Sequence, residues 1–260
     1  MSSQKRAIIL ILVCVFLLGG LFNRELVIAI ETVGMKIAPS AERAYAYGSW
    51  HFDAQDTRLY DIDRAEYFFL RALSFDSNYP NAQHQLSRVS FLRGDLARAL
   101  ARIDIELTNV AAVPNSHYIR GLILGYMGRY EEAAHDYEIF LKSAPNNWAA
   151  VNDYAWVLLK ANRPDEALVA IEKVLPLWEE NPWLLNSYAT ALFETGRYTE
   201  ALEAAQKANR YVQEVTEREW LTAYPGNDPK IAQMGVESFR EAVADNMHSI
   251  EAALANQRVQ

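Results

Sequence analysis

The sequence has 260 residues, of which 51% are hydrophobic, and it carries a formal net charge of −8. This composition supplies a folded core and excludes an extensively disordered chain. Residues 31–260 hold 22 basic and 32 acidic side chains, so this part would repel the phosphates of a nucleic acid. The single cysteine excludes an intrachain disulfide framework and a cysteine-based metal site.

Residues 1–30 are predicted to form a signal anchor, a single transmembrane helix with its core at about residues 7–22. These 16 residues contain no charged side chain, and they follow Lys5 and Arg6. A helix of this length rises about 24 Å, which is slightly less than the roughly 30 Å hydrocarbon core but can span a locally thinned bilayer. The preceding basic residues favour a cytoplasmic N-terminus, which would place the rest of the chain outside the cytoplasm.

Two alternatives stay open for this segment. Val27-Ile28-Ala29 offers a site for signal cleavage, which would give a secreted or periplasmic protein. The apolar run could also be a buried helix of the core. Residues 31–40 are predicted to be a connector, with an amphipathic helix along the membrane surface as the alternative.

A period of 34 residues governs the middle of the chain, in segments that begin at Pro80, Pro114, Trp148 and Pro182. Each segment has a glycine, or once an asparagine, five residues before an alanine. The pairs are Gly94 and Ala99, Gly128 and Ala133, Asn162 and Ala167, and Gly196 and Ala201. Glycine and asparagine best tolerate the left-handed conformation that ends a helix. A small residue also recurs earlier in each segment, at Ser87, Gly121, Ala155 and Ala189. The pattern predicts two closely packed helices in each segment.

These positions resemble the tetratricopeptide repeat, or TPR. The resemblance implies an all-α fold, a TPR α-solenoid in which helix-turn-helix repeats form a right-handed superhelix, here preceded by the transmembrane helix. Five repeats are predicted, at residues 41–79, 80–113, 114–147, 148–181 and 182–215. The first has Gly48 as its small residue and a longer turn around Gln55 to Asp61.

Two features depart from a regular array. Gln83, His117 and Arg120 stand where the family usually has bulky apolar residues, and we interpret them as side chains in contact with solvent or the groove. After residue 215 the period fails, and a turn-rich stretch precedes a long amphipathic helix. Residues 216–260 are therefore predicted to be capping helices with a polar outer face.

No enzyme motif accompanies the repeats. The five histidines form no His-Glu-x-x-His arrangement, and the chain has no nucleophile elbow, phosphate loop or dinucleotide-binding fingerprint. We expect no enzymatic activity, no cofactor, no metal site and no small-molecule substrate.

The resemblance implies that the first helix of each repeat lines a concave groove. The candidate partner-binding residues in this groove are His84, Gln85, Arg88, Tyr118, Asn152, Trp156, Asn186 and Thr190. Amide side chains both donate and accept hydrogen bonds, so they can hold an extended peptide backbone. The alternative for Trp156, Asn152 and Asn186 is packing between repeats.

The sequence therefore predicts a membrane-anchored scaffold or adaptor that binds a protein or peptide. The alternative is a regulatory or substrate-holding subunit of an envelope enzyme or of a secretion or assembly complex.

Overall fold

The computed structural model describes residues 24–109, 113–224 and 226–257. The predicted anchor core at residues 7–22 lies outside these ranges. The described residues form helices and no strand. The helices are α2 (Arg24–Ile37), α3 (Ala41–His51), α4 (Ile62–Phe75), α5 (Ala82–Leu92), α6 (Leu96–Thr108), α7 (Asn115–Tyr126), α8 (Tyr130–Ser143), α9 (Trp148–Lys160), α10 (Pro164–Val174), α11 (Pro182–Glu194), α12 (Tyr198–Val212), α13 (Glu217–Ala223) and α14 (Ala232–Gln257), with short 3-10 helices η1 (Leu175–Leu177) and η2 (Pro229–Ile231).

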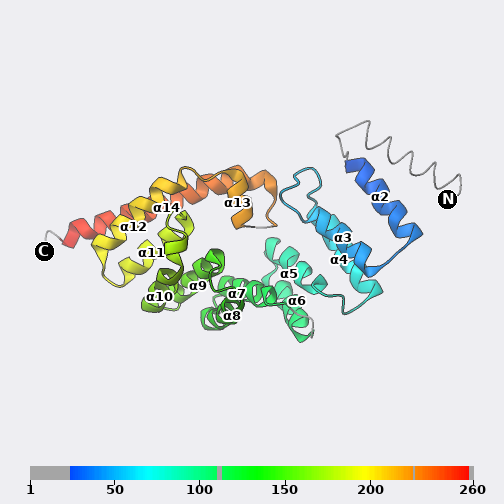
Figure 1. The fold of residues 1–260 in the computed structure, drawn as a ribbon, viewed down its shortest axis with the longest axis horizontal. Helices are drawn as coiled ribbons and strands as arrows, with labels where there is room; N and C mark the ends of the chain where they lie inside the picture. Colours follow the sequence, from blue (N-terminus) through cyan, green and yellow to red (C-terminus); the bar gives the residue numbers. More distant parts are fainter. Residues whose placement is uncertain (1–23, 110–112, 225, 258–260) are drawn as a thin grey trace.

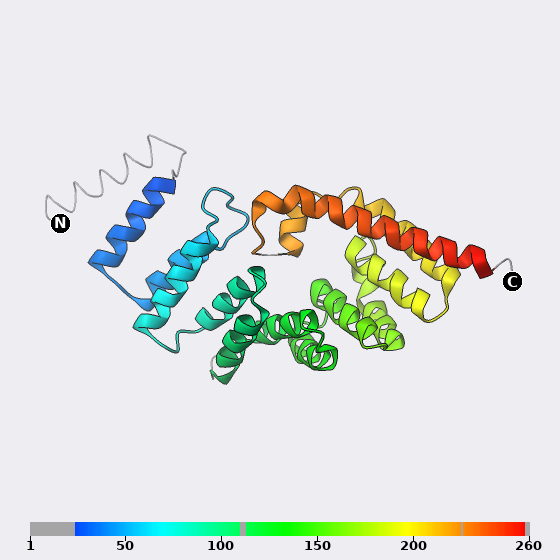
Figure 2. The same cartoon turned by 180° about the vertical axis from the view of Figure 1, so that it is seen from behind.

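The helices from α3 to α12 pack as five consecutive pairs that follow one another in an arch (Figure 1). The same arch is seen from behind in Figure 2, where α13 and α14 lie across its open side. The all-α helical repeat architecture predicted from the sequence is therefore confirmed.

The turns inside the pairs follow the local chemistry that the sequence indicates. Gly94, Gly128 and Gly196 have φ angles of 75°, 77° and 79°, and Asn162 has 59°. In every pair after the first, three residues separate the two helices, and the middle one of the three has this left-handed φ. The first pair instead has a turn of ten residues, 52–61, between α3 and α4.

Small residues allow the paired helices to approach closely. Ala99, Ala133, Ala167 and Ala201 are fully buried. A Cβ atom added to Gly121 would lie 3.2 Å from the ring of Tyr137, and one added to Gly48 would lie 2.7 Å from Phe69. Larger side chains at these positions would force the helices apart, which explains the recurrence of small residues.

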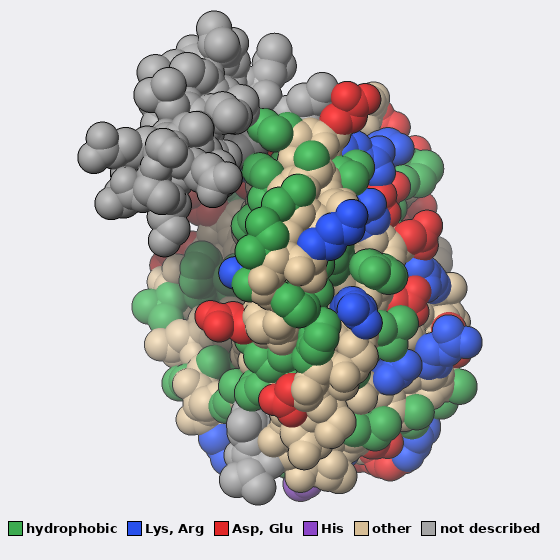
Figure 3. Space-filling view, turned by 90° about the vertical axis from the view of Figure 1, so that its right-hand side faces the viewer, with side chains coloured by type: hydrophobic (Ala, Val, Ile, Leu, Met, Phe, Trp, Pro, Cys, Tyr) green, Lys and Arg blue, Asp and Glu red, His purple; other side chains and the backbone are tan. Residues whose placement is uncertain are grey.

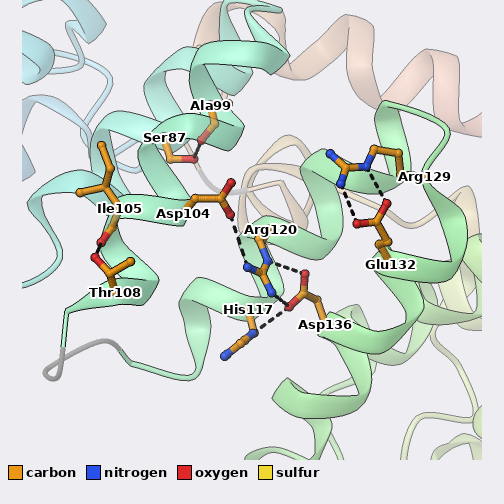
Figure 4. Close-up of polar contacts among 10 residues, drawn as sticks. All are labelled: Ser87, Ala99, Asp104, Ile105, Thr108, His117, Arg120, Arg129, Glu132 and Asp136. Carbon is orange, nitrogen blue, oxygen red and sulfur yellow. Dashed lines mark hydrogen bonds and ion pairs between the residues drawn. The ribbon is translucent and has the colours of Figure 1, made fainter.

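A buried carboxylate explains two departures from the usual repeat pattern (Figure 4). Asp136 of α8 is 1% exposed, and it accepts hydrogen bonds from Nε and Nη2 of Arg120 at 2.7 and 2.8 Å. Nδ1 of His117 also lies 2.7 Å from this carboxylate. Arg120 and His117 are partly exposed, but their polar ends point into the α7–α8 pair. Paired in this way, the buried charge is stabilised.

A second buried carboxylate attaches α2 to the first helix pair. Glu31 is 1% exposed, and its Oε1 lies 2.6 Å from Nε2 of the fully buried His51. Arg64 of α4 donates to the other carboxylate oxygen. The segment that was predicted to be a connector is thus helical as far as Ile37 and is held against α3 and α4 by charge.

The C-terminal helices pack against the last repeat. Val212 and Ala208 of α12 form a buried cluster with Trp220 and Leu221 of α13 and with residues of α14. Arg240 of α14 donates to backbone carbonyl groups at the end of α12. These contacts hold α13 and α14 against the second helix of the last repeat.

Among residues 24–109, 113–224 and 226–257, no helix combines the length and apolar character needed to cross a membrane. Figure 3 shows the N-terminal end of the molecule, where hydrophobic side chains are interspersed with charged ones. On α2, Val33 and Ile37 are 52% and 78% exposed, and on α4 Tyr67 is 59% exposed.

Candidate functional site: a cavity on the concave face

The first helices of the middle repeats surround a cavity of about 610 Å³. The cavity lies on the inner side of the arch and is bounded by α5, α7, α9 and α11. The lining side chains are mostly aromatic or aliphatic, with a few polar groups among them. They include Arg88, Phe91, Leu92, Tyr118, Ile119, Leu122, Tyr126, Trp148, Asn152, Asp153, Trp156, Trp183, Ser187, Tyr224 and Asn227.

Tyr224 and Asn227 also line this cavity, and together with Gly226 we call them the C-terminal turn. The indole Nε1 of Trp183 donates to the Tyr224 hydroxyl at 3.1 Å. On the opposite side, the Tyr60 hydroxyl donates to the carbonyl oxygen of Gly226 at 2.6 Å. The turn therefore connects the last repeat with the long turn of the first beside the cavity, which we call the chamber.

Aromatic rings form two walls of the chamber. Tyr126 and Trp156 have ring centroids 5.4 Å apart, and Trp148 and Trp183 have the same separation. Trp183 also stacks on Phe239 of α14, with centroids 4.8 Å apart. Rings held in this way offer a large apolar surface that needs little further ordering when a ligand binds.

Asp153 is the acidic group of the chamber. Its Oδ2 accepts a hydrogen bond from the Tyr118 hydroxyl at 2.7 Å, and its Oδ1 accepts one from Nδ2 of Asn152 at 3.3 Å. Burial raises the pKa of the carboxyl from 3.8 to about 6, against the opposing effect of these two hydrogen bonds. Asp153 forms no ion pair within the part of the chain that the structure describes.

Arg88 is the basic group of the chamber. Its Nη1 donates to Oε1 of Gln85 at 2.8 Å, and its guanidinium lies 4.7 Å from the centroid of the Phe52 ring. Burial lowers the pKa of this guanidinium from its ordinary value. Arg88 therefore lies between the first helix pair and the chamber.

Four of the eight predicted groove residues line this chamber, namely Arg88, Tyr118, Asn152 and Trp156. Asn152 also accepts a hydrogen bond from Oγ of Ser187 at 2.8 Å, so it connects α9 with α11. Trp156 packs against α7, because a Cβ atom on Gly125 would lie 2.7 Å from its ring. Both side chains combine a structural contact with a surface that faces the cavity.

The other four predicted residues lie elsewhere. Nδ2 of Asn246, on α14, donates to Oδ1 of Asn186 at 2.9 Å and to Oγ1 of Thr190 at 3.2 Å. These two residues therefore contact the chain's own C-terminal helix. His84 and Gln85 border a separate hollow beside Tyr45 and Pro114.

The imidazole of His84 is buried, with Nδ1 3.1 Å from Oγ of Ser116. Burial, together with the charge of Arg88, lowers the pKa of His84 from 6.5 to about 4. At neutral pH the ring is uncharged, so His84 adds no positive charge beside Arg88.

The C-terminal turn was missed as part of the site. Its residues lie outside the 34-residue period, and only a dense turn signal marks them in the sequence. The hydrogen bond between Trp183 and Tyr224 joins residues 41 positions apart in the sequence, and the one between Tyr60 and Gly226 joins residues 166 positions apart. Local patterns do not predict contacts of this range. No group of three or more metal-binding side chains lies together among the described residues.

Comparisons with known proteins agree with this architecture. Two family models described as Tetratricopeptide repeat match residues 118–182 and 158–223. A tetratricopeptide repeat protein from Parabacteroides merdae has a TM-score of 0.57 at 14% identity, covering 85% of this chain and 90% of its own. MamA has a TM-score of 0.54 at 18% identity, covering 59% and 90% respectively.

YrrB, described as a TPR protein with an unusual peptide-binding site, has a TM-score of 0.52 at 18% identity. The match covers 73% of this chain and 97% of YrrB. No curated protein matches the sequence. Together, the family models and the solved structures show that the chain contains tetratricopeptide repeats.

Proposed function

We propose that this chain is an interaction scaffold that binds a segment of a partner protein in the chamber. The observation that carries the proposal is the cavity of about 610 Å³ on the inner face of the repeats. Its volume is within the range of about 300–1,000 Å³ typical of ligand sites. The walls are apolar and carry a few polar groups. They favour a peptide segment that inserts one or two side chains into the chamber and forms hydrogen bonds through its backbone.

The likeness to YrrB supports this proposal, because YrrB is described as having a peptide-binding site. The amide of Asn152 and the hydroxyl groups of Ser187 and Tyr224 lie among the lining groups. Such groups can donate to and accept from a peptide backbone.

Selection from a random twelve-residue peptide library displayed on phage tests this function. Peptides enriched on the parent protein are synthesised, and their affinities are measured by calorimetry. Ala149 lines the chamber, so Ala149→Trp should fill it and weaken binding at least tenfold. Ala101 is exposed on α6, so Ala101→Trp is the matched control and should bind as the parent does. Equal binding by both variants would reject the chamber as the site.

We also propose that residues 1–30 anchor the scaffold in a membrane, with the repeats outside the cytoplasm. The apolar run at residues 7–22 and the preceding Lys5 and Arg6 support this topology. The exposed Val33 and Ile37 on α2 would suit a surface close to lipid. A reporter that is active only outside the cytoplasm, fused after Gln260, should be active. A silent reporter would reject the orientation, and a mature protein that begins after Ala29 would indicate signal cleavage.

A further inference from the structure

Asp153 occupies an unusual position for a carboxylate. It lies among the first helices of three repeats, where its nearest described polar partners are a phenol and an amide. A charge withdrawn from water costs free energy unless an opposite charge or several hydrogen bonds compensate. Of the fully buried carboxylates, Asp136 and Glu31 each have an arginine partner, and Glu106 accepts hydrogen bonds from the backbone N–H groups of Asn81 and His84. Asp153, which is partly exposed to the cavity, has no arginine, lysine or backbone partner among the described residues.

The surroundings of Asp153 are rich in aromatic rings. Tyr118 and Tyr126 of α7 and Trp156 of α9 line the same cavity, together with Tyr224 of the C-terminal turn. The phenol of Tyr118 bonds directly to the carboxylate. The faces of aromatic rings carry negative electrostatic potential and attract cations within about 6 Å of the ring centroid. Arg88 of α5 lines the same cavity, so a positive charge is favoured only in the part of the chamber beside Asp153 and these rings.

We propose that this chamber recognises a cationic side chain, the guanidinium or ammonium group of an arginine or lysine in the bound protein segment. This inference rests on the proposed function and adds the chemical class of the anchor residue. The cation would lie beside Asp153 and against the ring of Trp156 or Tyr126. It would supply the opposite charge that Asp153 lacks among the described residues, and the chamber has ample volume for the side chain and adjoining backbone.

The charge of Asp153 should also make this recognition depend on pH. A ligand cation needs the ionised carboxylate, which becomes protonated as the pH falls below about 6. The facing groups are Tyr118 and Tyr126 of α7, Tyr137 of α8, Tyr224 of the C-terminal turn, and Arg88 of α5. Burial raises the pKa values of all four tyrosines, and arginine stays charged, so none of these groups titrates between pH 5 and 7. Affinity should fall about tenfold from pH 7 to pH 5.

The test uses the library-selected peptides, which are synthesised as selected and again with each lysine or arginine replaced by glutamine. We expect one basic residue in each peptide to be essential, so that its replacement weakens binding at least tenfold. In the Asp153→Asn variant, the basic peptide and its glutamine counterpart should bind with equal affinity, and the affinity should no longer depend on pH. Asp245, an exposed acid on α14, provides the matched control, and Asp245→Asn should leave both unchanged.

The outcomes separate this inference from the proposed function. Peptides that bind in the chamber, lose binding with Ala149→Trp and tolerate every glutamine replacement would uphold the scaffold and overturn the cationic anchor. Loss of binding in Asp153→Asn for charged and uncharged peptides alike would also overturn it. Failure to select any peptide sensitive to Ala149→Trp would reject both proposals. Agmatine, a free guanidinium compound, should bind far more weakly than the peptides, and equal affinity would overturn the assignment to a protein segment.

Discussion

At the residue scale, the charge of Asp153 opposes folding, although the proposed recognition of a cation depends on that charge. The carboxyl has a pKa of about 6 in the folded chain against 3.8 for an unburied aspartate. At a pH between these two pKa values, the carboxyl of Asp153 is protonated in the folded state and ionised in the unfolded state. Stability therefore falls as the pH rises from about 4 to 6, and the full cost is present above that range.

Asp153→Asn should consequently stabilise the protein at pH 7, by on the order of 1–3 kcal/mol. At pH 3 both states of the parent are largely protonated, so the gain should nearly vanish. Thermal melting of parent and variant at the two pH values measures the difference. A variant that melts lower than the parent at pH 7 would mean that the carboxylate holds the repeats together.

At the scale of the helix pair, close packing depends on the buried alanines. Ala133 of α8 is fully buried, and its carbonyl oxygen would lie 3.3 Å from a Cβ atom on Gly121 of α7. Ala133→Leu should overpack this contact and lower the free energy of unfolding by roughly 1–3 kcal/mol. Ala101→Leu places the same side chain at an exposed position of α6 and should leave stability nearly unchanged. Urea denaturation compares the two, and equal midpoints would place Ala133 outside the contact.

The attachment of α2 is a second property at this scale. Glu31→Gln keeps the size of the buried side chain but leaves His51 and Arg64 without their carboxylate. Loss of one partner of a buried ion pair costs about 3–5 kcal/mol, which should release α2 from the first helix pair. Hydrogen exchange of the α2 amides should become faster, while α9 to α12 keep their protection. The exposed Glu42 provides the control, and Glu42→Gln should not alter exchange in α2.

The sequence could predict the elements that local chemistry and periodicity determine. The positions of Gly94, Gly128, Asn162 and Gly196 locate the helix ends, and the alanines locate the close contacts. Contacts between distant segments follow no period. Asn186 occupies the position equivalent to Asn152 one repeat later. Of the two, only Asn186 accepts a hydrogen bond from Asn246 of α14. The candidate site was therefore predicted in its middle repeats and missed at the C-terminal turn.

At the scale of the whole molecule, the C-terminal turn joins the last repeat to the first beside the chamber. Its contact with the first repeat depends on the extended turn at residues 52–61, which supplies Tyr60. The packing of Ala54 in the same buried cluster as Trp183 and Trp220 adds a second contact between these distant parts. A ligand in the chamber would therefore lie beside this turn, against Tyr224 and Asn227.

Tyr60→Phe tests the connection between the first and last repeats, because it removes the hydrogen bond to Gly226 and keeps the ring. Loss of the bond should weaken this connection by about 0.5–1.5 kcal/mol, enough to accelerate exchange of the Gly226 and Asn227 amides several-fold. Loosening of the turn should also raise the association rate of the selected peptides. Tyr67 is exposed on α4, so Tyr67→Phe is the matched control and should change neither rate. If Tyr60→Phe leaves amide exchange and association as in the parent, the apolar contacts around Ala54 alone maintain the connection.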